Sequence, residues 1–333
     1  MNNSMDIQIL DTHFQGMAQV TAVYLLVGPD GPVLIETGPG STLPAVISAL
    51  AAQGFRPRDI KHVLLTHIHL DHAGAAGWWA RQGAQIYVHH VGAPHLIDPS
   101  KLLASATRIY GDRMDMLWGE FLSAPAEKVT PLYDGDIVRA GGLTFTALDT
   151  PGHAYHHHTY IVETGVFLEN PVSIASPLET GVPGRNPVSR IAFTGDAAGV
   201  RLPQFNVVDL PAPPPEFHLE TWLGTLDRLE AAAAGVIYPT HFGPIRDIHG
   251  HLSQLRTLMV DAVAFVEARL GGLEDLTGSG KPVRSVLLEE YIAWNRARAA
   301  AMNLSPTAVE SYELANPLFM SVDGILRYLR KRG

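Results

Sequence analysis

Residues 66–74 read Thr-His-Ile-His-Leu-Asp-His-Ala-Gly, which places three histidines and an aspartate within six positions. Imidazole and carboxylate groups are metal ligands, and this density of them exceeds what a fold needs for stability. His67 and His69 are two positions apart, so both side chains point to the same side of an extended segment. Asp71 and His72 follow where the chain turns toward a helix. We therefore expect one strand end to supply ligands to two neighbouring metal sites.

A structural role is the alternative for any single histidine, because histidines in proteins are more often hydrogen-bonded than metal-bound. The chain contains 16 histidines, so some clustering is expected by chance. The spacing His-x-His-x-Asp-His at a strand end is nevertheless a narrow pattern. It favours a metal site over a set of structural side chains.

The elements around these residues place them at strand ends. The β-branched, apolar segment 60–65 predicts a buried strand, and open α/β sheets carry their chemistry at the C-terminal ends of strands. Three later apolar segments also predict short strands, and each ends in a turn with one further candidate ligand. The segments and their candidates are 143–148 with His153, 190–193 with Asp196, and 236–238 with His241.

In this order the set resembles the metallo-β-lactamase superfamily, and the resemblance covers residues 7–245. It implies an α/β fold, an αβ/βα four-layer sandwich with two mixed sheets face to face and the metals in a cleft along one edge. Residues 1–245 would form the catalytic domain and residues 246–333 a helical C-terminal region. The resemblance assigns His67, His69 and His153 to a first metal, Asp71, His72 and His241 to a second, and Asp196 as the bridge between them.

Two features bear on the branch of the superfamily. The chain has no cysteine, so it lacks the thiolate ligand of one large group of true β-lactamases. The bridging Asp196 resembles the glyoxalase II, lactonase and phosphodiesterase branches. The Pro-Gly-His run at 151–153 resembles the loop of thioesterase-like and lactonase-like members. Glu36 stands where the family usually has an aspartate that supports the metal-binding loop, so the role of this longer side chain is left open.

The resemblance implies a dinuclear metal-dependent hydrolase in which a metal-bridging hydroxide attacks an ester, thioester or lactone of a small molecule. Asp196 would fix the metal separation and Asp71 would handle the transferred proton. Zinc is the favoured metal, and iron or manganese suits the same ligands. The alternatives are a non-haem iron oxygenase of the persulfide dioxygenase type, a phosphodiesterase on the same fold, and a non-catalytic binding module. The additional ligands Asp71, His72 and His241 favour two metals.

The composition of the chain favours some classes of binding partner and argues against others. The chain is 46% hydrophobic and 17% charged, enough for a large core with an appendage. A net charge of −9 argues against a nucleic-acid partner. Residues 1–6 lack the pattern of a signal peptide, and no apolar run approaches the roughly 20 residues of a membrane span. The absence of cysteine fits a reducing compartment, so we expect a cytoplasmic enzyme. We also expect a small-molecule substrate, no membrane partner and compatibility with a homo-oligomer.

Other segments carry structural predictions. Asp30-Gly31 predicts the turn between strands at 20–27 and 33–35, and Ser41 is expected to cap a helix through about residue 53. A strand is expected at 85–90 and an amphipathic helix at 219–229. Helices are expected at 252–266, 283–302, 306–315 and 318–331, the third capped by Ser305. Residues 163–188 predict a Gly/Pro-rich insertion, and the proline-rich stretch 197–217 predicts a covering loop.

Several residues are candidates for substrate contacts: His157, Phe205 and Tyr291. For His157 a purely structural role is equally compatible with the sequence. The proline-rich loop and the C-terminal helices are expected to set substrate choice. Residues 93–128, with Tyr110, Met114, Met116, Trp118 and Phe121, fit either a wall of the cleft or the core. His89 and His90 are expected at surface or loop positions, and the roles of His156 and His158 stay open.

Overall fold

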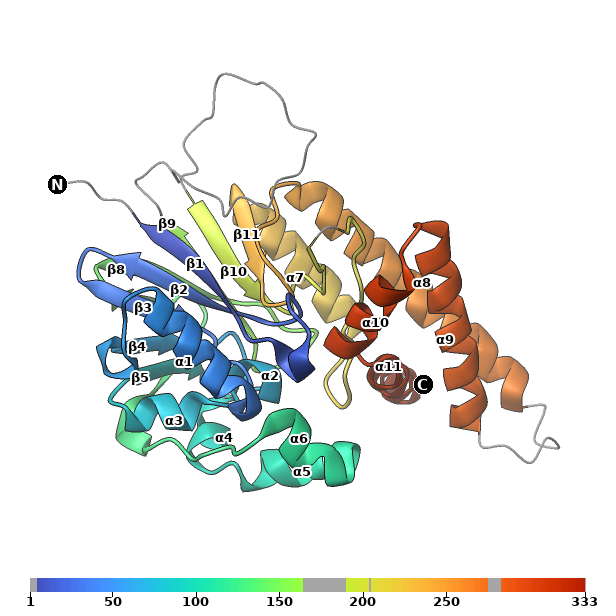
Figure 1. The fold of residues 1–333 in the computed structure, drawn as a ribbon. Helices are drawn as coiled ribbons and strands as arrows, with labels where there is room; N and C mark the ends of the chain where they lie inside the picture. The colour runs from blue at the N-terminus through green and yellow to red at the C-terminus, as the bar shows by residue number, and fades with distance from the viewer. Residues whose placement is uncertain (1–4, 164–189, 204, 275–282, 333) are drawn as a thin grey trace, which may run out of the picture.

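The computed structural model describes residues 5–163, 190–203, 205–274 and 283–332. Figure 1 shows two β-sheets packed against each other, with helices on both outer sides. The first sheet has the order β1-β2-β3-β4-β5-β6. Its strands are β1 Asp6–Asp11, β2 Ala22–Gly28, β3 Gly31–Ile35, β4 His62–Leu64, β5 Gln85–His89 and β6 Val129–Leu132. Strands β3 to β6 run parallel, and β1 to β3 run antiparallel.

The second sheet has the order β11-β10-β9-β8-β7, with only the β10–β11 pair parallel. Its strands are β7 Ile137–Ala140, β8 Leu143–Asp149, β9 His158–Glu163, β10 Arg190–Gly195 and β11 Val236–Pro239. Both sheets are therefore mixed, as predicted. Apart from Glu163, the insertion predicted at 163–188 lies outside the described residues.

Helices cover the outer faces of both sheets. On the side of the first sheet these are α1 Leu43–Ala52, α2 Leu70–Ala73, α3 Ala76–Arg81, α4 Ala93–Ile97, α5 Ser100–Tyr110 and α6 Met114–Trp118. The later helices are α7 Leu219–Ala231, α8 Ile248–Glu274, α9 Val283–Ala301, α10 Pro306–Ala315 and α11 Leu318–Arg332. Short 3-10 turns lie at Phe14–Gly16, Gly40–Thr42, Pro57–Asp59, Gly111–Arg113 and Ala126–Lys128.

Successive side chains of each strand point to opposite faces of its sheet, and this divides the interior into layers. In β10, Ile191 and Phe193 point between the sheets, where Phe193 packs against Tyr24 of the first sheet. Ala192, the residue between them, faces the opposite way into the cluster formed with α7 and α8. A third cluster, which includes Trp79 of α3 and Leu50 of α1, covers the outer face of the first sheet. This arrangement confirms the four-layer α/β sandwich.

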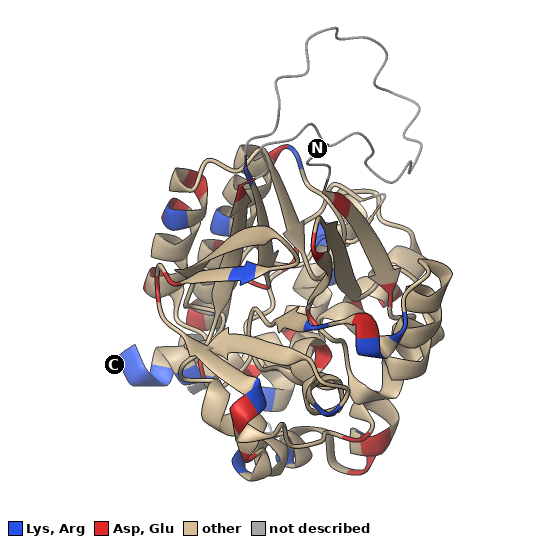
Figure 2. Cartoon of the chain, turned by 90° about the vertical axis from the view of Figure 1, so that its left-hand side faces the viewer, with Lys and Arg blue, Asp and Glu red and all other residues tan. Residues whose placement is uncertain are grey.

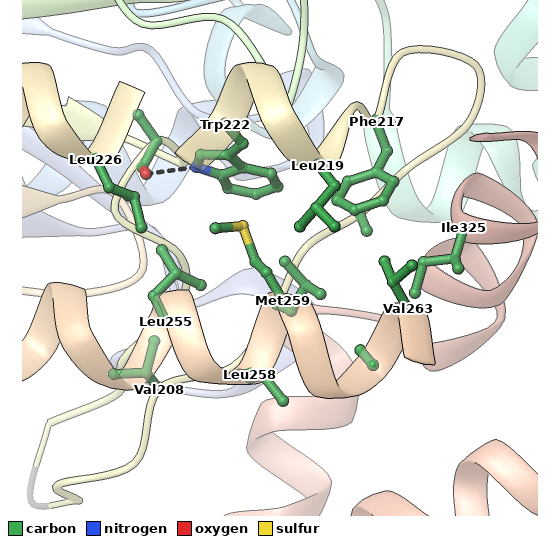
Figure 3. Packing of buried hydrophobic residues seen from close by; sticks show 14 of the residues in the cluster. Val208, Phe217, Leu219, Trp222, Leu226, Leu255, Leu258, Met259, Val263 and Ile325 are labelled. Carbon is green, nitrogen blue, oxygen red and sulfur yellow. Dashed lines mark hydrogen bonds between the residues drawn. The ribbon is translucent and has the colours of Figure 1, made fainter. Parts of the chain in front are cut away.

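The C-terminal helices share a core with the rest of the chain. Figure 3 shows Trp222 and Leu226 of α7 against Leu255 and Met259 of α8, with Ile325 of α11 close by. Burial of these side chains removes apolar area from water, which stabilises the contact. The helical region is confirmed, and it is packed on the sandwich rather than separate from it. The boundary at residue 245 therefore stays a proposal about sequence organisation.

Two local predictions were wrong in detail. The β2–β3 register pairs Gly28 with Gly31, so Pro29 and Asp30 form the loop. Ser41 does not cap α1, because α1 begins at Leu43 and the Ser41 hydroxyl donates to the carbonyl of Leu117. The Ser305 cap is confirmed: its side-chain oxygen accepts a hydrogen bond from the Ala308 backbone N–H at the start of α10.

Acidic and basic side chains are interspersed over the helices and loops visible in Figure 2. This mixture agrees with the negative net charge of the chain. In the described residues no helix combines the length and hydropathy needed to cross a membrane.

Helix α11 packs tightly on the proline-rich segment, and Gly324 permits this approach. A Cβ at position 324 would collide with the carbonyl oxygen of Ala212, whereas a Cβ at Gly271 of α8 would meet open space. We expect Gly324→Ala to lower the free energy of unfolding by about 1–3 kcal/mol through overpacking. Gly271→Ala is the matched control and should raise it by up to about 1 kcal/mol through helix propensity. Urea denaturation of both variants tests this, and equal effects would contradict it.

Candidate metal centre

The seven predicted ligands converge at one edge of the sandwich. β4 ends at Leu64, and an extended stretch carries His67 and His69 to the first turn of α2, which holds Asp71 and His72. In the second sheet β10 ends at Gly195, directly before Asp196. His153 and His241 follow the ends of β8 and β11. Strand ends position five of these side chains, as the sequence predicted, and the first turn of α2 positions Asp71 and His72.

Three imidazoles form the first group of donors. The Nδ1 atom of His69 lies 2.9 Å from Nε2 of His67 and 2.9 Å from Nε2 of His153. All three donor atoms lie within 4.8 Å of one another. His67 and His153 are fully buried, and His69 lines a cavity open to solvent. Three converging ring nitrogens are a common ligand set for zinc and for other divalent transition metals.

Asp71, His72 and His241 form the second group, with donor atoms also within 4.8 Å of one another. Oδ2 of Asp71 lies 3.4 Å from Nε2 of His241 and 3.6 Å from Nε2 of His72. Asp71 is the more exposed member, with 21% of its side chain accessible, while His72 is fully buried. The group therefore presents a carboxylate toward the cavity and two imidazoles behind it.

Asp196 lies between the two groups. Its Oδ1 atom is 3.4 Å from Nε2 of His72 and 3.6 Å from Nε2 of His241, both in the second group. Its Oδ2 atom is 3.5 Å from Nε2 of His153 in the first group. Each oxygen of one carboxylate thus faces a different set of imidazoles, which is the geometry required of a bridging ligand.

The outward hydrogen bonds of the histidines determine which ring atom faces the centre. Nδ1 of His241 lies 2.7 Å from the carbonyl oxygen of Val20, and Nδ1 of His153 lies 2.8 Å from that of Pro211. A carbonyl oxygen only accepts, so each Nδ1 must carry the proton. The Nε2 atoms of both rings consequently point their lone pairs inward, as metal ligands must.

Glu36 performs the same function for His72 and His67. Its Oε1 atom lies 3.2 Å from Nδ1 of His72 and accepts the hydroxyl of Thr66 at 2.5 Å. The Thr66 oxygen in turn lies 3.1 Å from Nδ1 of His67. The hydroxyl of Thr240 also donates to Oε1, at 3.2 Å. Glu36 is fully buried and has a positive φ of 66°, a strained conformation that is common at functional sites. Its longer side chain therefore orients the ligand loop.

The protein alone does not satisfy this centre. Among the described residues, Nε2 of His72 and Oδ1 of Asp196 are buried without a hydrogen-bond partner. Unpaired buried polar atoms are costly, and inward-facing lone pairs repel one another. Divalent cations would remove both costs, because imidazole nitrogen and carboxylate oxygen are their ordinary ligands. The residues present therefore fit two metal ions.

Burial and charge affect the two groups differently. Burial, together with neighbouring histidines, lowers the pKa of His67 and lowers the pKa of His69 to about 3. For His72 and His241, burial is outweighed by nearby carboxylates, above all Asp71 and Asp196, and the pKa of each is raised. Without metal, protons on His72 and His241 would replace the missing positive charge.

A cavity of about 630 Å³ reaches this centre from the surface. One wall consists of α5 and α6, with Tyr110 and Trp118, which favours the cleft-wall interpretation of that segment. The opposite wall consists of the proline-rich segment 211–215 and residues of α9 to α11. The lining residues from those helices include Leu288, Ile292, Leu314, Leu318, Phe319 and Met320. The walls are mainly apolar, and ligand groups gather at the floor.

The family model of the metallo-β-lactamase superfamily matches residues 17–168, which include the first five predicted ligands. The match identifies residues 17–168 as a metallo-β-lactamase superfamily domain.

Curated relatives of this metallo-β-lactamase domain include two named thioesterases. An atrochrysone carboxyl ACP thioesterase of Aspergillus fumigatus is 27% identical over 70% of this chain and 40% of its own length. A protein of the same name from Cryptosporiopsis is 24% identical over 71% of this chain and 53% of its own length. The chain thus matches only about half of each relative. Among solved structures, a metallo-β-lactamase family protein from Thermus thermophilus superposes with a TM-score of 0.62, at 23% identity over 99% of this chain and 94% of its own.

One predicted substrate contact, His157, faces the interior of the metallo-β-lactamase domain instead. It is fully buried, and its Nε2 atom accepts the backbone N–H of Asp196 at 3.2 Å. Its Nδ1 atom lies 2.8 Å from the hydroxyl of Thr150. Both ring nitrogens are therefore occupied within the protein, which favours the structural role that the sequence also allowed for His157. His157 holds the backbone of the bridging aspartate.

Phe205 and Tyr291 also lie outside the cavity lining. Phe205 packs beside Tyr312 in the cluster between the sheets. Tyr291 is 1% exposed and packs on Phe265 of α8. Its neighbours on α9, Leu288 and Ile292, line the cavity instead. The C-terminal helices therefore form the wall as expected, but with another face of α9.

The remaining histidines belong to carboxylate networks beside the centre. His89 is buried, contrary to the prediction. Its Nε2 atom lies 3.5 Å from Oδ1 of Asp149. Nε2 of His158 shares the same oxygen at 2.7 Å. The three residues have a spacing compatible with a metal. However, Nδ1 of His89 accepts the backbone N–H of Val91, so its Nε2 carries a proton rather than a free lone pair.

His156 also lines the cavity, and its Nε2 atom lies 3.4 Å from Oε2 of Glu216. His90 is half-buried and stacks on the exposed ring of Tyr133.

The opposite pKa shifts predict an order of metal release. A protonated imidazole cannot bind metal, and His72 and His241 take up protons at higher pH than His67 and His69. On acidification we expect the Asp71–His72–His241 group to lose its ion first. Metal content after dialysis should fall from about two ions per chain near neutral pH to about one at mildly acidic pH. Simultaneous loss of both ions, or retention at the second group alone, would contradict this order.

The substitution Glu36→Gln tests whether Glu36 orients His72 for metal binding. The amide keeps nearly the same shape but removes the negative charge that accepts the His72 Nδ1 proton. We expect the affinity of the second group for zinc to fall about 10–100-fold. Affinity at the first group should change less, because it is reached only through Thr66. Competition with a chelator measures both constants, and exposed Glu163→Gln is the control. Equal affinities in Glu36→Gln and the control would refute the role.

Proposed function

We propose that this chain is a dinuclear metal-dependent hydrolase that cleaves small-molecule esters and thioesters, with thioesters favoured. The observation that carries the proposal is the position of Asp196, whose two oxygens face the two donor groups. The names of the two thioesterase relatives support the choice of an acyl substrate. The apolar cavity supports it as well, because an acyl chain is apolar and the reacting carbonyl must lie at the centre.

Metal ions bound here would supply an activated water and polarise the substrate carbonyl. The protein residues position this chemistry. Asp196 sets the separation of the two groups, and His157 holds the backbone of Asp196. Asp71 is partly exposed to the cavity, and the charges of His72 and His241 outweigh burial and lower its pKa to about 2. It is therefore ionised at neutral pH and is the group best placed to accept a proton from the attacking water.

The alternatives fit the observations less well. A persulfide dioxygenase type of site would hold one iron with only His67, His69, His153 and Asp196, and it has no use for a second group. Here Asp71, His72 and His241 are assembled as completely as the first group. A phosphodiesterase must bind an anionic group, whereas the walls of this cavity are mainly apolar. Lactones share the carbonyl chemistry and remain within the proposed class.

The test is a substrate screen with metal analysis. Purified protein should contain about two ions per chain. We expect hydrolysis of acyl thioesters and p-nitrophenyl esters that a chelator abolishes and zinc or manganese restores. Turnover of bis-p-nitrophenyl phosphate in preference to every ester would favour the phosphodiesterase. Oxygen consumption with persulfide and a single bound iron would favour the oxygenase.

Asp196→Ala tests the bridge. Loss of the carboxylate leaves each donor group one ligand short, so we expect kcat/KM to fall by about two to four orders of magnitude. Bound metal should decrease, while circular dichroism and the unfolding midpoint stay close to those of the wild type, since Asp196 carries no core packing. Asp227→Ala, on the exposed side of α7, is the matched control and should be neutral. Near-normal turnover in Asp196→Ala would show that the carboxylate does not bridge.

A further inference from the structure

Tyr110 is the last residue of α5 and lines the same cavity as Asp71 and His241. Its ring packs edge-on against Trp118, with ring centroids 5.1 Å apart and an interplanar angle of 70°. Trp118 in turn stacks on Phe14 at 5.6 Å. This aromatic packing fixes the orientation of the phenol, because a tyrosine has few rotatable bonds and its ring is held on its face.

The same cluster places Tyr110 on one side of the metal centre. It contains Leu70, which directly precedes Asp71, and Val20, whose carbonyl holds Nδ1 of His241. Tyr110 therefore lies on the side of the Asp71–His72–His241 group rather than on that of His153. This second group contains Asp71, the partly exposed carboxylate that we propose accepts a proton from the attacking water.

The hydroxyl of Tyr110 is free to bind a ligand. Within the part of the chain that the structure describes, it makes no hydrogen bond to another residue. Two other polar groups of the cavity are already engaged: Asn316 donates to Asp209 and Leu210, and Arg296 pairs with Glu313. Burial and the nearby Asp71 charge raise the pKa of Tyr110, so the phenol keeps its proton and acts as a donor.

We propose that the Tyr110 hydroxyl donates a hydrogen bond to the carbonyl oxygen of the substrate and stabilises the negative charge that develops on it. The inference rests on the proposed function, since it concerns the same reaction. When water adds to the carbonyl carbon, the electron pair of the C=O bond moves onto oxygen. A donor fixed in advance beside that oxygen stabilises the transition state more than the ground state. Tyr110 keeps its proton throughout and transfers none.

A role in packing alone is the competing explanation, and Tyr110→Phe separates the two. The substitution keeps the ring against Trp118 and removes only the hydroxyl. For the best ester or thioester substrate we expect kcat to fall about 10–100-fold with KM changed less than about threefold. Metal content and unfolding midpoint should be unchanged. Tyr133→Phe, at an exposed tyrosine outside the cavity lining, is the matched control and should leave kcat unaltered.

A binding measurement keeps this test separate from that of the proposed function. Octanoate carries the carboxylate oxygens of a hydrolysis product and an apolar chain, and calorimetry on metal-loaded protein gives its affinity. We expect Tyr110→Phe to weaken octanoate binding about 10–100-fold, the loss of one hydrogen bond to a charged group. If the wild type cleaves no ester or thioester, the proposed function fails, while weaker octanoate binding in the variant still supports Tyr110 as the donor. Unchanged kcat in an active enzyme, or equal octanoate affinity in both proteins, overturns the inference.

Discussion

The constraint on which this structure depends is the direction of the histidine protons. Nδ1 of His241, His153 and His72 each face an acceptor outside the centre: two backbone carbonyls and the carboxylate of Glu36. Because those protons point outward, the Nε2 lone pairs point inward, where the Nε2 atom of His72 has no hydrogen-bond partner among the described residues. Cations at the centre would remove the repulsion between these lone pairs and pair these atoms. The ligand geometry is thus built by the surroundings as much as by the ligands.

That dependence explains the strand arrangement. Val20 precedes β2, Glu36 follows β3, and His241 follows β11, so the two sheets must meet at one edge for the contacts to form. The tight core between the sheets, with Tyr24 against Phe193, fixes this meeting. Close-packed interiors transmit small displacements rather than absorbing them, so core substitutions between the sheets should also alter the centre. Stability and site geometry are therefore coupled through the same layer.

The candidate metal ligands could be identified from the sequence because a short apolar run followed by turn residues marks the end of a strand. His153, Asp196 and His241 each have such a run in front of them, and the two-residue spacing of His67 and His69 sets their common direction. The outward acceptors were not predictable, because a backbone carbonyl such as that of Pro211 leaves no side-chain signal. Glu36 did leave one, a buried carboxylate position at the end of an apolar strand. Its partner Thr66 became visible only when β3 and β4 were seen to be parallel neighbours.

The residues of the cavity walls were harder to predict, because the sequence does not show which face of a buried helix points toward the cavity. Helix α9 has apolar residues on more than one face, so the sequence shows that it is buried without showing which neighbour it meets. In the structure α8 and α11 take the face with Tyr291, and the face with Leu288 and Ile292 is left to the cavity. The chemistry thus lies on strand ends that both sheets hold rigidly, whereas the walls come from helices packed later in the chain. Substitutions on those helices can therefore change the shape of the cavity without moving any of the seven candidate ligands.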